Sequence, residues 1–82
     1  MYVVYVIKSL MFPFTYVGFT DNLERRMNQH NNARGRSTKP YAPFELIHTE
    51  IWEDRISARK REKYLKSTAG KHYLRKINSL KE

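Results

Sequence analysis

Residues 2–7 of the chain are Tyr2-Val3-Val4-Tyr5-Val6-Ile7, an unbroken run of β-branched and aromatic side chains. Such a run predicts a strand that is buried on both faces of a sheet. Pro13 prevents this strand from running on, and the next run, Thr15-Tyr16-Val17-Gly18-Phe19, is predicted to be its hairpin partner. Gly18 indicates either a bulge or a position that the backbone or a ligand must approach closely.

A short helix is predicted after the hairpin, over about residues 22–30. Asp21 is expected to cap its N-terminus, and Glu24 three residues later would complete a capping box. Leu23 and Met27 lie one turn apart and would form its inward-facing stripe. The helix is followed by a polar loop that carries three cations, Arg34, Arg36 and Lys39.

The second half of the chain predicts a third strand and two more helices. Residues 44–52 are rich in Ile, Leu, Phe and Thr and predict the strand. Asp54 is expected to cap a helix that runs to about Ser67, and residues 68–70 are expected to break it. A last helix is predicted over about residues 71–80. The expected inward-facing residues are Ile56, Ala58 and Leu65 in the first of these helices, and Tyr73, Ile77 and Leu80 in the second.

The predicted order is therefore β-β-α-β-α-α in an α/β (α+β) fold. We expect a small three-stranded sheet with flanking helices, at least partly antiparallel because the first turn is too short for a parallel return. At 82 residues, the chain is expected to be one domain over residues 1–82.

Charge is the strongest compositional clue. The chain has 16 Lys and Arg against 8 Asp and Glu, a net charge of +8. The electrostatic field of a small protein with this net charge attracts polyanions and favours contact with nucleic acid. There is no cysteine, which excludes disulfides and thiolate metal sites and fits a reducing cytoplasm. No apolar run is long enough to span a bilayer, so no membrane association is expected.

Three groups of residues carry candidate chemistry, and each has an ordinary structural alternative. Glu62 stands alone among cations and is either a hard oxygen ligand for Mg²⁺ or a surface partner of Lys66. Arg26 and His30 lie four residues apart and so share one helix face. Either Arg26 binds phosphate and His30 transfers a proton or positions the substrate, or both are ordinary solvated side chains. Tyr5 and Tyr16 are core aromatics unless cations or a metal-bound water lower the phenol pKa.

These pieces occur in an order that resembles the GIY-YIG nuclease family. The matching segments are Val3-Val4-Tyr5, Tyr16-Val17-Gly18 eleven residues after Tyr5, the run Asp21 to His30, and Ala58, Glu62 and Leu65-Lys66. The chain is most similar to the small standalone bacterial members, which resemble the nuclease domains of the excision-repair protein UvrC and of a structure-specific repair nuclease. Val3 departs from the family pattern, which has glycine there.

The resemblance implies a hydrolase that uses one Mg²⁺ or Mn²⁺ ion, with Glu62 as the metal ligand. It implies that Tyr5 and Tyr16 lie near the attacking water, one of them as general base, and that Arg26 neutralises the scissile phosphate. His30 matches a position that often holds histidine or tyrosine, Gly18 matches the glycine that allows close approach to the site, and Lys66 matches a frequent basic position. The family also has an asparagine near the end of the domain, and Asn78 is a possible match for it in this sequence.

The sequence therefore predicts a metal-dependent endonuclease that hydrolyses phosphodiester bonds in DNA, branched or damaged DNA being the expected substrate. RNA remains an alternative substrate, and a protein partner could supply specificity. Arg34, Arg36 and Lys39 could follow the phosphate backbone. The alternative functions are a catalytically inactive nucleic-acid-binding module or partner-dependent subunit, and a basic ribosome- or membrane-associated protein.

Overall fold

The computed structural model describes residues 1–32 and 38–81, with side chains described through residue 77. Its elements, in chain order, are β1 (Tyr2–Ser9), β2 (Thr15–Thr20), α1 (Leu23–Asn31), η1 (Lys39–Tyr41), β3 (Phe44–Trp52), α2 (Arg55–Lys66) and α3 (Thr68–Lys81). The predicted α/β class and the order β-β-α-β-α-α are confirmed, and the short 3-10 helix η1 is an addition that the sequence patterns did not predict.

The sheet has the strand order β2-β1-β3, and both pairs are antiparallel. Because β1 is the central strand, Val4, Tyr5, Val6 and Ile7 are all buried, as the apolar run predicts. The β1–β2 register continues without a break from Val3↔Thr20 to Lys8↔Thr15. Gly18 is therefore not a bulge glycine, and its role must come from what lies against it.

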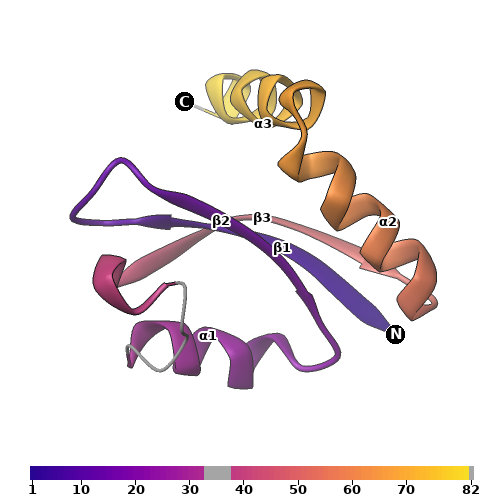
Figure 1. Cartoon of the computed structure of the whole chain (residues 1–82), viewed down its shortest axis with the longest axis horizontal. Helices are drawn as coiled ribbons and strands as arrows, with labels where there is room; N and C mark the ends of the chain where they lie inside the picture. The colour runs from indigo at the N-terminus through magenta and orange to yellow at the C-terminus, as the bar shows by residue number, and fades with distance from the viewer. Residues whose placement is uncertain (33–37, 82) are drawn as a thin grey trace.

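The helices cover both faces of the sheet, α1 on one side and α2 with α3 on the other (Figure 1). Alternation along β1 supplies both interfaces. One buried cluster lies under α2 and α3 and consists of Val4, Val6, Val17, Ala58, Leu65 and Leu74. The other lies under α1 and contains Tyr5, Ile7 and Phe44, with Leu23 and Met27 packed against it as predicted. In the described part of the chain, no helix has the length and apolarity needed to span a bilayer.

The start of α1 differs from the prediction by one residue. Asn22, with extended backbone angles, is the N-cap, and its side-chain oxygen accepts from Arg25 N at 3.0 Å. Thr20 holds this turn, because its hydroxyl oxygen accepts from Asn22 N at 3.1 Å. The prediction that Asp21 caps the helix in a capping box with Glu24 is wrong; the exposed Asp21 instead pairs with Arg25 at 3.5 Å.

The junction of α2 and α3 also differs from the prediction. Asp54 caps α2 as expected, but the interruption lies at Ser67, and residues 68–70 are already part of α3. Gly70 is buried against α2, where an added Cβ would overlap the Tyr64 carbonyl oxygen and the Leu65 Cα. The glycine therefore permits close packing of two helices and does not break one.

The inward-facing residues of these helices are corrected accordingly. Ala58 and Leu65 are fully buried, but Ile56 is 71% exposed, so its predicted core role is wrong. In α3, Gly70 and Leu74 are buried, and Ile77 is partly buried and packs against the core as predicted. The predicted inward role of Tyr73 is wrong, because this residue is 37% exposed. The predicted contact of Leu80 lies outside the described side chains.

A polar clamp attaches α2 to β3. Arg61 donates from Nε and Nη2 to the two carboxylate oxygens of Glu50, at 2.8 and 3.0 Å. His48 Nε2 lies 2.8 Å from the same carboxylate, and Trp52 Nε1 donates to it at 3.3 Å. Burial alone would raise the pKa of Glu50, but the hydrogen bonds from Arg61 and His48 outweigh burial and lower it. The bidentate pair fixes the orientation of α2 on the sheet.

Candidate active site

Tyr5 is the centre of a buried hydrogen-bonded chain. Its side chain is 1% exposed and points toward α1. Arg26 Nε donates to the Tyr5 oxygen at 3.3 Å, and His30 Nε2 lies 2.9 Å from the same oxygen. A guanidinium has only donors, so the Tyr5 oxygen accepts from Arg26 and the hydroxyl proton is available to His30.

His30 continues this chain to Thr38. The imidazole is fully buried, and its Nδ1 lies 2.8 Å from the Thr38 hydroxyl, which is also buried. Burial, together with the positive charge of Arg26, lowers the pKa of His30 to about 4, so the ring is neutral at pH 7. With Nε2 accepting from Tyr5, we assign the remaining proton to Nδ1, which donates to Thr38.

The ionisation of Tyr5 and Arg26 follows from the same contacts. Burial raises the pKa of Tyr5, and the Arg26 hydrogen bond offsets only part of this rise. Burial lowers the pKa of Arg26, but its hydrogen bond and charge interaction with Tyr5, with a further contribution from Tyr16, raise the pKa overall. At neutral pH the site therefore holds a neutral Tyr5 phenol against a permanently charged guanidinium.

Gly18 provides the space that Tyr5 occupies. The two residues are direct partners in the β1–β2 register. A Cβ added at Gly18 would lie 2.5 Å from the Tyr5 oxygen, 2.7 Å from its Cζ and 3.0 Å from Tyr16 Cε2. The close approach predicted for Gly18 is thus made by the two tyrosines, whose ring centroids are 6.3 Å apart.

Glu62 reaches this cluster from the opposite layer of the molecule, on α2. Its carboxylate lies 3.5 Å from the Lys66 ammonium, which in turn lies 5.7 Å from the centre of the Tyr16 ring. The charge of Glu62 is close enough to Tyr5 to contribute to the raised pKa of that phenol. The structure therefore joins Tyr5, Arg26 and His30 by hydrogen bonds and packs Tyr16 against Tyr5 and His30. Glu62 is linked to this group through Lys66, which lies over the Tyr16 ring.

This combination of tyrosines, arginine and lone glutamate corresponds to a known domain family. A family model described as the GIY-YIG catalytic domain matches residues 1–78. The chain belongs to the GIY-YIG family. GIY-YIG proteins form a nuclease superfamily, so the chain has a nuclease fold.

Similar proteins come from bacteria and archaea. A UPF0213 protein of Clostridium perfringens is 37% identical over 65 residues, which cover 78% of this chain and 70% of that protein. A UPF0213 protein of Natronomonas pharaonis is 40% identical over 63% of this chain and 62% of its own length. A third, from Staphylococcus saprophyticus, is 31% identical over 77% of this chain and 78% of its own. No solved structure matches the chain.

The donor set of this GIY-YIG chain suits a hard divalent ion held in part by substrate. Among residues 1–32 and 38–77, no group of three or more His, Cys, Asp or Glu side chains could form an all-protein metal site. Glu62, with its side chain 13% exposed, offers one carboxylate, which pairs with the Lys66 ammonium that lies over the Tyr16 ring. Mg²⁺ is commonly bound by one or two carboxylates, several waters and substrate phosphate oxygens. Glu62 fits that role, with Lys66 as the cation that presently neutralises it.

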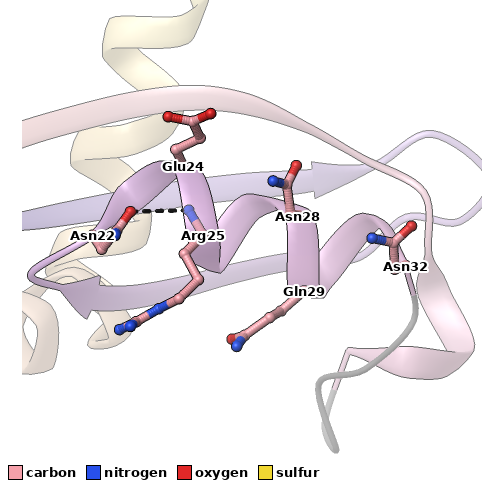
Figure 2. A pocket seen from close by; sticks show the side chains of 6 residues that line it. All are labelled: Asn22, Glu24, Arg25, Asn28, Gln29 and Asn32. Atoms are coloured by element: carbon pink, nitrogen blue, oxygen red, sulfur yellow. Dashed lines mark hydrogen bonds between the residues drawn. The ribbon is translucent and has the colours of Figure 1, made fainter.

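The remaining predicted residues lie outside the cluster or outside the described residues. Lys39 begins η1 and is exposed, and Arg34 and Arg36 lie outside the described residues, as does the side chain of Asn78. A shallow pocket of about 340 Å³ lies on the outer side of α1, lined by Asn22, Glu24, Arg25, Asn28, Gln29 and Asn32 (Figure 2). None of the predicted site residues lines it, so we do not assign the chemistry to this pocket.

Two contributors were missed by the sequence analysis. Gln29 accepts from Arg26 Nη1 at 2.9 Å and so holds the guanidinium in place. Its position three residues after Arg26, on the same helix face, is a signal that could have identified it. Thr38 carried no such signal, because its contact with His30 depends on where the polar loop returns to the sheet.

Proposed function

We propose that this GIY-YIG chain is a divalent-metal-dependent endonuclease that hydrolyses phosphodiester bonds in DNA. The observation that carries the proposal is the placement of Arg26 and Glu62 around the adjacent Tyr5 and Tyr16 rings: Arg26 donates to Tyr5, and Glu62 pairs with Lys66, which lies over Tyr16. The two charged groups come from helices on opposite faces of the sheet. A protein that only bound DNA would gain nothing from a carboxylate beside its phosphate contacts.

Arg26 is proposed to stabilise the charge that develops on the phosphoryl oxygens during attack. Its Nε donates to Tyr5 and its Nη1 donates to Gln29, so the guanidinium is held in a fixed orientation. Oriented donors of this kind stabilise a transition state more than a ground state because they need no reorganisation. Glu62 would hold Mg²⁺ or Mn²⁺, which supplies Lewis-acid polarisation of the phosphate when bound.

The two tyrosines are proposed to have different roles. Tyr5 is buried, and its raised pKa disfavours the phenolate, so we assign it to orienting Arg26. Tyr16 is only partly buried and lies on the edge strand beside Lys66. We therefore place Tyr16 next to the attacking water, as the group that accepts or relays its proton. His30, which is fully buried, acts through Tyr5 and is a positioning residue.

Affinity for the DNA backbone is proposed to come from cations around the site. Lys66 is positioned to contact a phosphate once its carboxylate partner binds a metal ion. Lys39, Arg34 and Arg36 would add contacts from the segment before β3. Such contacts provide affinity without reading sequence, so binding should weaken steeply with salt.

A cleavage assay on plasmid and branched DNA with Mg²⁺ or Mn²⁺ tests this function. We expect the wild type to cut, and Glu62→Gln and Arg26→Lys each to cut about 10²-fold more slowly. Glu45→Gln, an exposed carboxylate on β3, is the matched control and should cut normally. Both site variants should still bind DNA in EDTA, because their defect lies in the chemical step.

The Lys66–Glu62 pair favours one alternative, a catalytically inactive nucleic-acid-binding module or partner-dependent subunit. In that case the lysine would neutralise the carboxylate permanently. Wild-type protein that binds DNA but never cuts it, with any metal ion, would establish the alternative. Cutting that survives Glu62→Gln unchanged would place the active centre elsewhere.

A further inference from the structure

The loop between β1 and β2 exposes a small apolar tip. Leu10, Met11 and Phe12 are 57%, 69% and 48% exposed, and the loop projects beyond the end of the sheet (Figure 1). Three adjacent large apolar side chains in solvent are unusual in a chain with a net charge of +8. They contribute little to the core and are available to contact a partner.

The backbone of this tip is held firmly. Ser9 is buried, and its hydroxyl donates to the Tyr41 carbonyl at 2.6 Å while accepting from Met11 N and Phe12 N, both at 3.1 Å. Leu10 N donates to the Pro43 carbonyl at 3.0 Å. The exposed side chains are thus mounted on a fixed support, which lowers the entropic cost of inserting them into a partner.

Aromatic packing supports the tip from behind. The Phe14 ring stacks on Tyr41 with 3.9 Å between centroids and 8° between planes. The Phe12 ring meets the edge of Tyr41 at 5.8 Å. Tyr41 of η1 therefore packs against both aromatic residues that follow Met11 and holds the tip in place.

Two cavities lined in part by cations lie beside the candidate active site, and one of them includes Phe14, two residues after Phe12 of the tip. A cavity of about 350 Å³ extends along β2 under α2 and α3; its lining residues are Phe14, Thr15, Tyr16, Val17, Leu65, Lys66, Lys71 and Leu74. A second cavity, of about 280 Å³, shares Thr15, Lys71 and Leu74 with it and adds Arg75. All charged residues that line these two cavities are cations, so this surface beside the site suits a phosphate backbone.

We propose that the apolar tip is a wedge that stacks on or between base pairs where a DNA duplex ends or branches. The proposal rests on the proposed function and names its substrate class. Phe, Leu, Met and Pro are the side chains that DNA-bending proteins insert between base steps. Residues 10–13 are Leu10-Met11-Phe12-Pro13. From Met11 to Tyr16 the chain spans at most about 17 Å, so the cut should fall within about five base steps of the branch.

The test uses a double variant that leaves the bracing intact. Leu10→Ser/Met11→Ser removes two exposed tip side chains and keeps Ser9, Phe12 and Phe14. Ile56→Ser is the matched control, because Ile56 is 71% exposed and Met11 is 69% exposed. Each protein is titrated, in EDTA, onto a forked DNA duplex with 2-aminopurine at the branch, whose fluorescence rises when the base unstacks. An unbranched duplex of the same sequence is titrated in parallel.

We expect wild type and Ile56→Ser to raise the fluorescence at the fork, and the double variant to bind the fork about tenfold more weakly with little rise. All three should bind the unbranched duplex alike. Cleavage of the fork should lie near the branch for wild type and spread along the duplex for the double variant.

Equal fork binding and equal fluorescence for wild type and double variant would overturn the wedge while leaving the nuclease intact. Wild-type protein that binds no DNA at all would overturn both. A double variant that keeps its fork binding but loses self-association in sedimentation, or loses binding to anionic vesicles, would assign the tip to a second copy or to a lipid surface instead.

Discussion

Gly18 and Tyr5 face each other across β1 and β2, and the Tyr5 hydroxyl occupies the space that a side chain at position 18 would need. Gly18→Ala would place a methyl group 2.5 Å from the Tyr5 oxygen. Tyr5 cannot move away cheaply because its hydroxyl is bonded to Arg26 and His30. We expect the variant to lose about 1–3 kcal/mol of unfolding free energy and to cut DNA at least about tenfold more slowly.

The control for this prediction is a double-mutant cycle with Tyr5→Phe. Removing the hydroxyl relieves the closest contact, so Gly18→Ala should cost less in the Tyr5→Phe background than in the wild type. Urea unfolding of the four proteins measures the coupling. Additive costs would mean that the two residues do not compete for the same space.

His30 makes the stability of the fold depend on pH. Its pKa of about 4 in the folded protein lies below the ordinary value of 6.5, so between these values the unfolded chain binds more protons. The unfolding free energy should therefore be highest above pH 6.5 and fall as the pH decreases to 4, by up to about 3 kcal/mol from this residue.

Chemical denaturation of wild type and His30→Gln, at several pH values from 4 to 7.5, measures this contribution. The variant should be less stable at pH 7 and should show a shallower decline on acidification, because unfolding then no longer exposes the His30 imidazole to protonation. Parallel curves for the two proteins would contradict the assignment of a buried neutral imidazole.

Lys66 is expected to compete with the metal ion for Glu62, since its ammonium lies 3.5 Å from that carboxylate. Lys66→Met should lower the Mg²⁺ or Mn²⁺ concentration needed for half-maximal cleavage by about 3- to 10-fold. It should also weaken DNA binding in EDTA, because one phosphate contact is lost. Lys63→Met, an exposed cation on the same helix, should leave the metal requirement unchanged; an equal shift in both variants would refute specific competition.

The Glu50–Arg61 pair should be a main attachment of α2 to the sheet. Glu50→Gln would leave Arg61 with a partly buried, unpaired charge, and we expect a loss of about 1–3 kcal/mol of unfolding free energy. Because the pKa of Glu50 is lowered by its partners, this stability is present above the ordinary glutamate pKa and is lost as the pH falls through the folded value. Glu53→Gln, exposed in the turn before α2, should unfold like the wild type.

The order of elements could be predicted because local patterns determine it. The apolar run at Tyr2 to Ile7 identified the central strand, and Asp54 identified the start of α2. Helix details were less predictable. The inward stripe of α3 depends on Gly70 packing against the backbone of α2, and composition alone suggested a helix break at that residue.

The members of the candidate site were identified by resemblance, and their partners were not. The contact between His30 and Thr38 joins residues on either side of a loop, and no periodicity predicts it. Likewise, the placement of Lys66, the partner of Glu62, over the Tyr16 ring depends on how α2 packs on the sheet. Neither the neutral state of His30 nor the clash at Gly18 could be inferred without side-chain positions.

The buried chain from Arg26 through Tyr5 and His30 to Thr38 has a consequence for how this protein can change. The side chains proposed to position the reacting groups also fill the core beneath α1. A substitution there would therefore lower both the cleavage rate and the stability of the fold. In so small a molecule, improvement by mutation is therefore most accessible at the periphery, in Lys66 and the hairpin tip, where selection can alter what is cut without endangering the scaffold.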